Sequence, residues 1–254
     1  MNTADHDDDA LAALDLAAWR GVLTGLSLMR FALLAFLCGL LALFILVPIF
    51  AFPLRNPPAW FAYAALGVIA GYFLMIALML LAGMAFCCAA PADFRARRHS
   101  RTAFALTLVF ASLVSTWIAW IVLMGQDLLP RNWINPFSGG RLFDLTNAVL
   151  ATAAVLLVIF IVALWCRFLQ DIAEAFDQAK LSQNVGFFKW WFCILSSGAV
   201  LAPVLAILSP FHEWYPLLAL LAVPSMINVP ISIAWGTALV IDTRNMLDKA
   251  LRSP

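Results

Sequence analysis

The sequence has little charge for its length. Only 11% of its 254 residues are charged, whereas 65% are hydrophobic, and the mean hydropathy is +0.96. Soluble domains carry about a quarter charged residues, so this composition excludes an ordinary soluble protein and predicts a membrane protein. No polar block longer than about 30 residues interrupts the chain. A separate soluble domain is therefore not expected.

Residues and motifs for catalysis are also scarce. The chain has three histidines and no His-Glu-x-x-His, phosphate-binding glycine loop or Gly-x-Ser-x-Gly pattern. An enzyme is therefore disfavoured, and we predict no catalytic residue, metal site or cofactor. One outward-facing acid/base or metal group could form from His212, Glu213, Asp127 and Asp144, and its alternative is a solvated rim. The net charge of +1 comes without a concentrated basic surface, so nucleic acid is not an expected partner.

What the chain does have is a series of long uncharged stretches. Beyond Arg30 there are six, at residues 31–54, 56–92, 102–126, 145–166, 190–212 and 214–241. Each exceeds the roughly 20 residues that cross a hydrocarbon core, where only helices satisfy their own backbone. The predicted fold class is therefore all-α, a polytopic bundle of six transmembrane helices over residues 31–242. The spans are expected at about 31–52, 60–87, 103–125, 145–166, 190–208 and 215–241.

The basic residues predict which ends of these spans face the cytoplasm. With the N-terminus inside, twelve Lys and Arg fall in inner segments and three, at positions 55, 131 and 141, in outer ones. Because inner loops carry the excess of Lys and Arg, the predicted topology is N-in and C-in. Residues 243–254 then form a cytoplasmic tail. Trp190 and Trp191 are expected near the inner interface.

Two segments outside the spans are expected to be helical. Residues 1–30 are expected to form a cytoplasmic segment with an amphipathic helix from Asp9, which either lies on the membrane or extends the first span. The fourth span is expected to continue as an amphipathic helix with Phe168, Ile172 and Phe176 on its apolar face. That helix is predicted to end near Leu181, with Ser182 or Asn184 capping the next helix.

The sixth span carries the strongest candidate site. Pro224 and Pro230 each remove a backbone donor, which predicts a kinked or broken helix. Ser225, Asn228 and Ser232 share one face, with Asn228 halfway along the uncharged stretch. A broken helix of this kind could hold a small polar solute near the midplane. Alternatively, the polar face packs against neighbouring helices, with partners drawn from Asn147, Thr152, Ser196 and Ser197.

A basic stretch and a set of small residues give further candidates. Arg95, Arg97, Arg98 and Arg101 either contact anionic lipid headgroups or simply fix the topology, and the two roles are compatible. Two stripes of small residues at helical spacing predict close helix packing, within one chain or in a homo-oligomer or membrane complex. These stripes comprise Gly21 and Gly25, and Ala64, Gly67, Gly71, Met75, Met79 and Gly83.

The five cysteines are expected to be small apolar filler. All are predicted in the cytoplasmic third of their spans, where thiols stay reduced, and no Cys-x-x-Cys pair supports a soft-metal cluster. They are Cys38, Cys87, Cys88, Cys166 and Cys193.

Two short segments resemble known sequences. Arg167-Phe168-Leu169 with Ile172-Ala173, and Trp19-Arg20 with Gly25-Leu26, are similar to segments of uncharacterised multi-pass membrane proteins of planctomycete-type bacteria. The resemblance covers about a fifth of the chain and implies a bacterial inner membrane, with no activity attached to any residue.

The functional expectation follows from these features. We expect a non-enzymatic, structural or accessory protein of the inner membrane, in contact with the lipid bilayer. The alternative is a transporter or channel for a small polar solute, with its site around Asn228.

Overall fold

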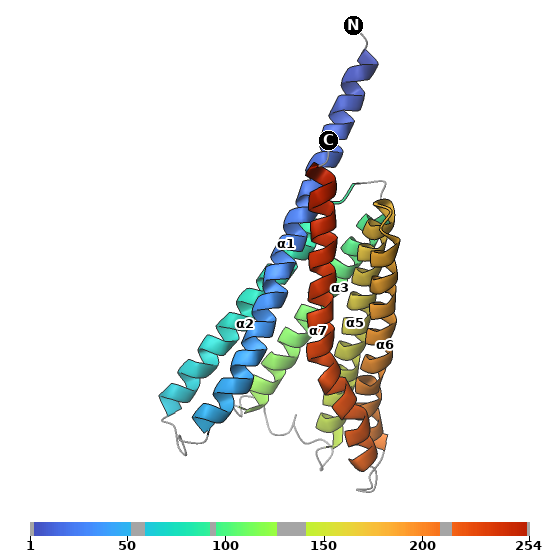
Figure 1. The fold of residues 1–254 in the computed structure, drawn as a ribbon. Coiled ribbons are helices and arrows are strands. Elements are labelled where there is room, and N and C mark those ends of the chain that lie inside the picture. The colour runs from blue at the N-terminus through green and yellow to red at the C-terminus, as the bar shows by residue number, and fades with distance from the viewer. Residues whose placement is uncertain (1–2, 52–58, 92–94, 126–140, 209–214, 253–254) are drawn as a thin grey trace. The chain divides into compact units, whose positions relative to one another are not determined.

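The structure is a computed structural model of residues 1–254, and it describes residues 3–51, 59–91, 95–125, 141–208 and 215–252. Within these ranges the chain forms six helices and no strand. They are α1 (Thr3–Ala51), α2 (Ala59–Cys87), α3 (Arg95–Gly125), α5 (Arg141–Ala175), α6 (Ala179–Leu208) and α7 (Tyr215–Arg252) (Figure 1). The all-helical fold class is confirmed, and each uncharged stretch corresponds to one helix.

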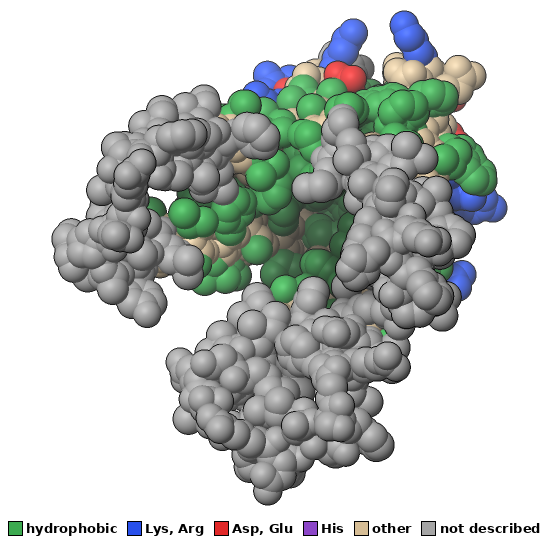
Figure 2. Space-filling model, turned by 90° about the horizontal axis from the view of Figure 1, so that it is seen from below, with side chains coloured by type: hydrophobic (Ala, Val, Ile, Leu, Met, Phe, Trp, Pro, Cys, Tyr) green, Lys and Arg blue, Asp and Glu red, His purple; other side chains and the backbone are tan. Residues whose placement is uncertain are grey.

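Three segments are long and apolar enough to cross a membrane, within the described residues. They are Leu16–Ala42 of α1, Gly67–Cys87 of α2 and Thr152–Ala175 of α5. Large apolar side chains such as Val68, Phe160 and Ile194 are more than half exposed, which water would penalise and lipid would not. Figure 2 likewise shows a face whose described side chains are mostly hydrophobic, with Lys and Arg at its edge. The protein is therefore a membrane protein.

The chain divides into two compact units. Unit 1 comprises residues 1–101, 168–184 and 233–254, and unit 2 comprises residues 102–167 and 185–232. Unit 1 therefore holds α1, α2 and the charged ends of α3, α5, α6 and α7. Unit 2 holds the remainder of those four helices.

In unit 1, α1 and α2 pack along each other (Figure 1). They approach most closely at Gly25 and Gly83, where a Cβ on Gly25 would lie 2.5 Å from the Gly83 carbonyl oxygen. The Cys87 thiol on the next turn is fully buried and lies 3.9 Å from the Val22 carbonyl oxygen. Tyr72 adds a second link, since its hydroxyl donates to the Ala35 carbonyl.

The predicted stripe on α2 is only partly a packing surface. Gly83 meets α1, but no atom lies within 4 Å of a Cβ built on Gly67 or Gly71. The reason is geometric: each step of four residues drifts by about 40° around the helix. Gly67 and Gly83 are four such steps apart, so they face directions about 160° apart. The prediction of one continuous packing stripe is wrong, whereas close helix packing, predicted for both stripes, is found at Gly25 and Gly83.

The N-terminal segment continues the first long helix. α1 runs through Arg30 without interruption. Of the two alternatives for this segment, an uninterrupted helix agrees with an extension of the first span. Trp19 of this extension packs edge-to-face on Phe176, with ring centroids 5.3 Å apart. The extension is therefore held by α5 residues of the same unit.

The turn between α5 and α6 comes earlier than predicted. α5 ends at Ala175, and α6 begins at Ala179, so Ser182 and Asn184 lie inside α6 and cap nothing. Asp177 has a positive φ of 53°. The Gln178 amide donates to the Ala173 carbonyl at 2.8 Å, and the Asp177 amide donates to the Glu174 carbonyl at 3.1 Å. These two bonds form a Schellman C-cap. The predicted apolar face is right, because Phe168 and Ile172 are fully buried.

Candidate functional site

The polar face of α7 forms a small buried cluster in unit 2. Asn228 is 3% exposed and Ser232 is 5% exposed. The Ser232 hydroxyl donates to Asn228 Oδ1 at 2.8 Å, and Trp191 Nε1 of α6 donates to the same oxygen at 3.2 Å. A side-chain amide oxygen has two lone pairs, so both are used within the protein.

Only part of the predicted polar set meets at this cluster. Of its predicted members, Ser232 bonds to Asn228, while Ser197 is exposed and donates to the Ile194 carbonyl of its own helix. Thr152 and Ser196 are half-buried, and no hydrogen bond joins them to Asn228 among the described residues. The side chains of Ser225 and Asn147 lie outside the described residues.

Trp191 is the partner that sequence reasoning missed. The residue was assigned to an interface because of its type and its position two residues after Lys189. Its hydrogen bond places Asn228 at the same level along the helices. Asn228 therefore cannot lie at the midplane while Trp191 lies at the inner interface. The stretch 214–241 is longer than a span requires, so its midpoint need not lie at the midplane.

The two prolines do not interrupt α7. The helix is continuous from Tyr215 to Arg252, through Pro224 and Pro230. Of the predicted kinked or broken helix, the break is therefore wrong and the kink stays a prediction. A proline removes one backbone donor, and neighbouring turns can keep their own hydrogen bonds. The Ser232 to Asn228 bond spans one such turn, because the two residues are four apart.

The basic stretch forms the first two turns of α3 in unit 1. Arg95, Arg98 and Arg101 are exposed, whereas Ser100 is fully buried. His99 Nδ1 lies 2.8 Å from Asp171 Oδ2 of α5, and this pair ties α3 to α5. Burial raises the pKa of the neighbouring Cys88 thiol, while a hydrogen bond with Ser100 acts in the opposite direction. Of the five cysteines, Cys87 and Cys166 are buried as apolar filler would be, Cys88 and Cys193 are half-buried, and Cys38 is exposed.

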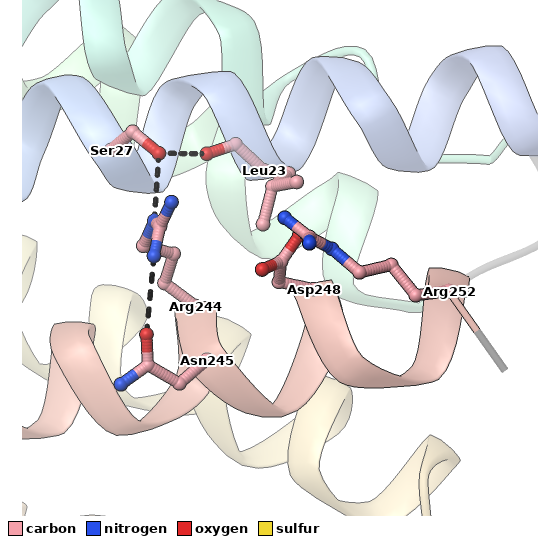
Figure 3. Close-up of polar contacts among 6 residues, drawn as sticks. All are labelled: Leu23, Ser27, Arg244, Asn245, Asp248 and Arg252. Atoms are coloured by element: carbon pink, nitrogen blue, oxygen red, sulfur yellow. Dashed lines mark hydrogen bonds and ion pairs between the residues drawn. The ribbon is translucent and has the colours of Figure 1, made fainter.

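The C-terminal turns of α7 carry a second polar group in unit 1. Arg244 Nε donates to Ser27 Oγ of α1 at 3.0 Å, and this hydroxyl donates to the Leu23 carbonyl (Figure 3). One turn later, Arg252 pairs with Asp248 at 3.0 Å (Figure 3). An open surface cavity of about 530 Å³ is lined by Asn245, Asp248, Lys249 and Arg252.

This cavity was not predicted from the sequence. Its residues repeat at i, i+3, i+4 and i+7 of one helix face, but the same pattern is typical of any solvated polar face. Its basic side chains stand beside Asp248, which already binds Arg252. The cavity therefore has the features of a solvated helix face, and the link between α1 and α7 is the bond from Arg244 to Ser27.

The described residues contain no group of three or more His, Cys, Asp or Glu side chains that could hold a metal ion. The predicted outer group of His212, Glu213, Asp127 and Asp144 has no described side chain. Comparisons with family models, curated proteins and solved structures found no match for this chain.

Proposed function

We propose that this chain is a non-enzymatic, structural or accessory protein of a bacterial inner membrane, with six spans and both termini in the cytoplasm. The observation that carries the proposal is the side-chain carbonyl oxygen of Asn228, which accepts hydrogen bonds from Trp191 and Ser232. A solute site needs polar groups that turn toward the solute. Here the side-chain oxygen of Asn228, the best candidate residue, already accepts two hydrogen bonds from within the protein.

The other buried polar side chains support the same reading. Among the described residues, Ser100, Thr237 and Thr243 are buried along with Asn228 and Ser232. The three hydroxyls donate to the carbonyls of Arg97, Ile233 and Leu239 within their own helices. Hydroxyls bonded in this way are already satisfied, so they need no ligand.

The bounds of the helices agree with the proposed topology. Several helices extend well beyond their uncharged stretches, and each extension is at a predicted cytoplasmic end: α1 begins at Thr3, α3 at Arg95 and α6 at Ala179, while α5 ends at Ala175 and α7 at Arg252. Alternating crossings would produce this pattern, because all of these extensions then fall on one side.

Replacement of Asn228 by Leu tests the proposal. Leu removes the acceptor that the Trp191 and Ser232 donors share, at a cost of about 1–2 kcal/mol in stability. The full-length protein and this variant would be reconstituted in vesicles, and both thermal unfolding and the flux of small polar solutes would be measured. Ser197→Leu is the control, because Ser197 is exposed and bonds only within its own helix.

The proposal expects a lower unfolding temperature for Asn228→Leu, an unchanged one for Ser197→Leu, and no protein-dependent flux in any sample. Solute flux through the wild-type protein that Asn228→Leu abolishes would replace the structural role with transport. Unchanged stability in Asn228→Leu would show that the cluster does not support packing.

A further inference from the structure

Two arginines of unit 1 are directed at the same turn of α1. Arg244 of α7 donates through Nε to the Ser27 hydroxyl at 3.0 Å (Figure 3). Arg30 follows Ser27 by three residues, so the Cβ atoms of these two residues are about 5–6 Å apart on one surface of α1. Side chains of a helix lean toward its N-terminus, so the Arg30 side chain extends over the turn that contains Ser27. We call Arg30 and Arg244 the α1–α7 arginine pair.

Arg30 has a buried donor that the protein leaves unused. Its Nε is buried and has no hydrogen-bond partner among the described residues. Its Cζ atom lies 5.7 Å from the ring centre of Phe31, a side chain that is 57% exposed. A buried N–H group of this kind needs an acceptor. Because the guanidinium group lies beside an exposed ring, that acceptor can come from outside the chain.

Arg244 is held by neutral groups. Besides the bond to Ser27, its Nη1 donates to Asn245 Oδ1 at 3.1 Å, and these bonds use two of the five N–H donors of a guanidinium group. Neither Arg30 nor Arg244 forms an ion pair among the described residues, and Asp248, one turn after Arg244, is already paired within α7. Two positive charges near one turn repel each other, so a bound anion would stabilise the pair.

The position of the pair in the sequence matches the depth of lipid headgroups. Arg30 immediately precedes the uncharged stretch 31–54, and Arg244 follows the stretch 214–241 by three residues. With these stretches in the hydrocarbon, arginines at their cytoplasmic ends lie at the level of the phosphates. The anion that is most abundant at this depth is the phosphate of an anionic lipid.

Exposed apolar side chains continue from Arg30 along α1. Phe31 is 57% exposed and Leu41 is 62% exposed, and both fall within an arc of about 100° that begins at Arg30. Leu41 lies about 16 Å further along the helix axis, which is close to half the roughly 30 Å thickness of a hydrocarbon core. This side of α1 therefore offers a surface for acyl chains next to the arginine pair.

From this geometry we propose that the α1–α7 arginine pair binds the phosphate group of an anionic phospholipid. Arginine is suited to this role, because its planar fork donates two hydrogen bonds to one phosphate. Arg30 supplies the buried Nε–H, and Arg244 contributes donors that Ser27 and Asn245 do not use. The acyl chains would lie along Phe31 and toward Leu41.

The test uses the full-length protein in a neutral detergent, with short-chain phosphatidylglycerol and phosphatidylcholine titrated separately. Native mass spectrometry measures lipid binding, and thermal unfolding measures stability with and without lipid. Arg30→Met is the test variant, because it removes the charge and the buried donor while it keeps a flexible, unbranched side chain. Arg20→Met is the matched control, since Arg20 is exposed on the same helix, ten residues before Arg30. Arg30→Lys keeps the charge.

The wild-type protein should bind phosphatidylglycerol more tightly than phosphatidylcholine. Arg30→Met should weaken the binding of phosphatidylglycerol about fivefold, the effect of one basic residue near a charged headgroup, and addition of Arg244→Gln should extend the loss to about 25-fold. Arg20→Met should stay within about twofold of wild type, and Arg30→Lys should bind more tightly than Arg30→Met. Without lipid, Arg30→Met should unfold at the wild-type temperature or above, because it removes an unpaired buried donor.

Four results would overturn the proposal. Equal binding by Arg30→Met and Arg20→Met would indicate diffuse charge attraction with no site. Equal binding by Arg30→Lys and Arg30→Met would show that charge at this position is not responsible. A lower unfolding temperature of Arg30→Met without lipid would assign Arg30 to packing within the chain. Stabilisation of the wild type by millimolar inorganic phosphate without lipid, absent in Arg30→Met, would assign the pair to a soluble phosphate compound.

Discussion

Substitution of Gly25 by Ala should destabilise the α1–α2 pair. The added Cβ would lie 2.5 Å from the Gly83 carbonyl oxygen and 2.7 Å from Cys87 Sγ. The carbonyl is part of a helix backbone, so it cannot move aside as a flexible side chain could. Ordinary contact begins at 3.4 Å, so the two helices must separate there by about 0.9 Å, the difference between 3.4 and 2.5 Å.

The expected loss combines two opposing effects. Overpacking of this severity costs about 1–3 kcal/mol, and separation also weakens the neighbouring contact between Cys87 and the Val22 carbonyl. Ala is the better helix former by up to about 1 kcal/mol, which offsets part of that cost. The net loss should be about 1–2 kcal/mol.

Gly71→Ala is the matched control on α2. A Cβ at that position meets no atom within 4 Å, so only the helix-propensity gain of up to about 1 kcal/mol remains. Gly71→Ala should therefore be about 2–3 kcal/mol more stable than Gly25→Ala, with the stability of the wild type between the two.

Unfolding of the detergent-solubilised protein measures the overall change, and alkylation of Cys87 measures the local one. Cys87 is fully buried beside the crossing, so it should react faster in Gly25→Ala and at the wild-type rate in Gly71→Ala. Wild-type stability in Gly25→Ala would refute the close crossing. An equal loss in Gly71→Ala would show that α2 packs through the face that is open in the structure.

Two further predictions concern the end of α5. Ile172→Ala should lose about 2–5 kcal/mol of stability because Ile172 is fully buried. The control Ile194→Ala, at a side chain that is 65% exposed, should change the stability by about 0.5 kcal/mol or less. Similar losses of the two variants in thermal unfolding would contradict the packing of unit 1. Asp177→Gly should stabilise the protein by up to about 1 kcal/mol, because its positive φ suits glycine. Gln178→Gly lacks that benefit and should be destabilising, so a loss in both variants would argue against the Schellman cap.

The six helices could be predicted because charges delimit the uncharged stretches, and lipid leaves the backbone few alternatives. The end of α5 could not be predicted in the same way. Its apolar periodicity continues from Phe168 and Ile172 to Phe176, because Phe176 packs on Trp19 after the helix has ended. Asp177 occupies the left-handed position where glycine is the usual signal, so nothing in the local sequence marked the turn.

The candidate site was predicted in composition but not in its contacts. Asn228 and Ser232 share a helix face by spacing alone, and the structure joins them. The bond from Trp191 depends on how α6 and α7 are aligned along each other. That alignment is set by packing between helices, which periodicity within one helix does not encode.

The arrangement of α6 near Trp191 narrows the depth at which this cluster can lie. Trp190 and Ile194 are each about two-thirds exposed, and Lys189 immediately precedes Trp190. An exposed tryptophan next to a lysine suits a membrane interface, while Ile194 one turn away suits hydrocarbon. With Trp191 at the interface predicted for it, Asn228 would lie near the headgroups as well, because Trp191 donates to its side chain. A buried amide at such a depth can stabilise helix packing without the penalty that a midplane site would carry.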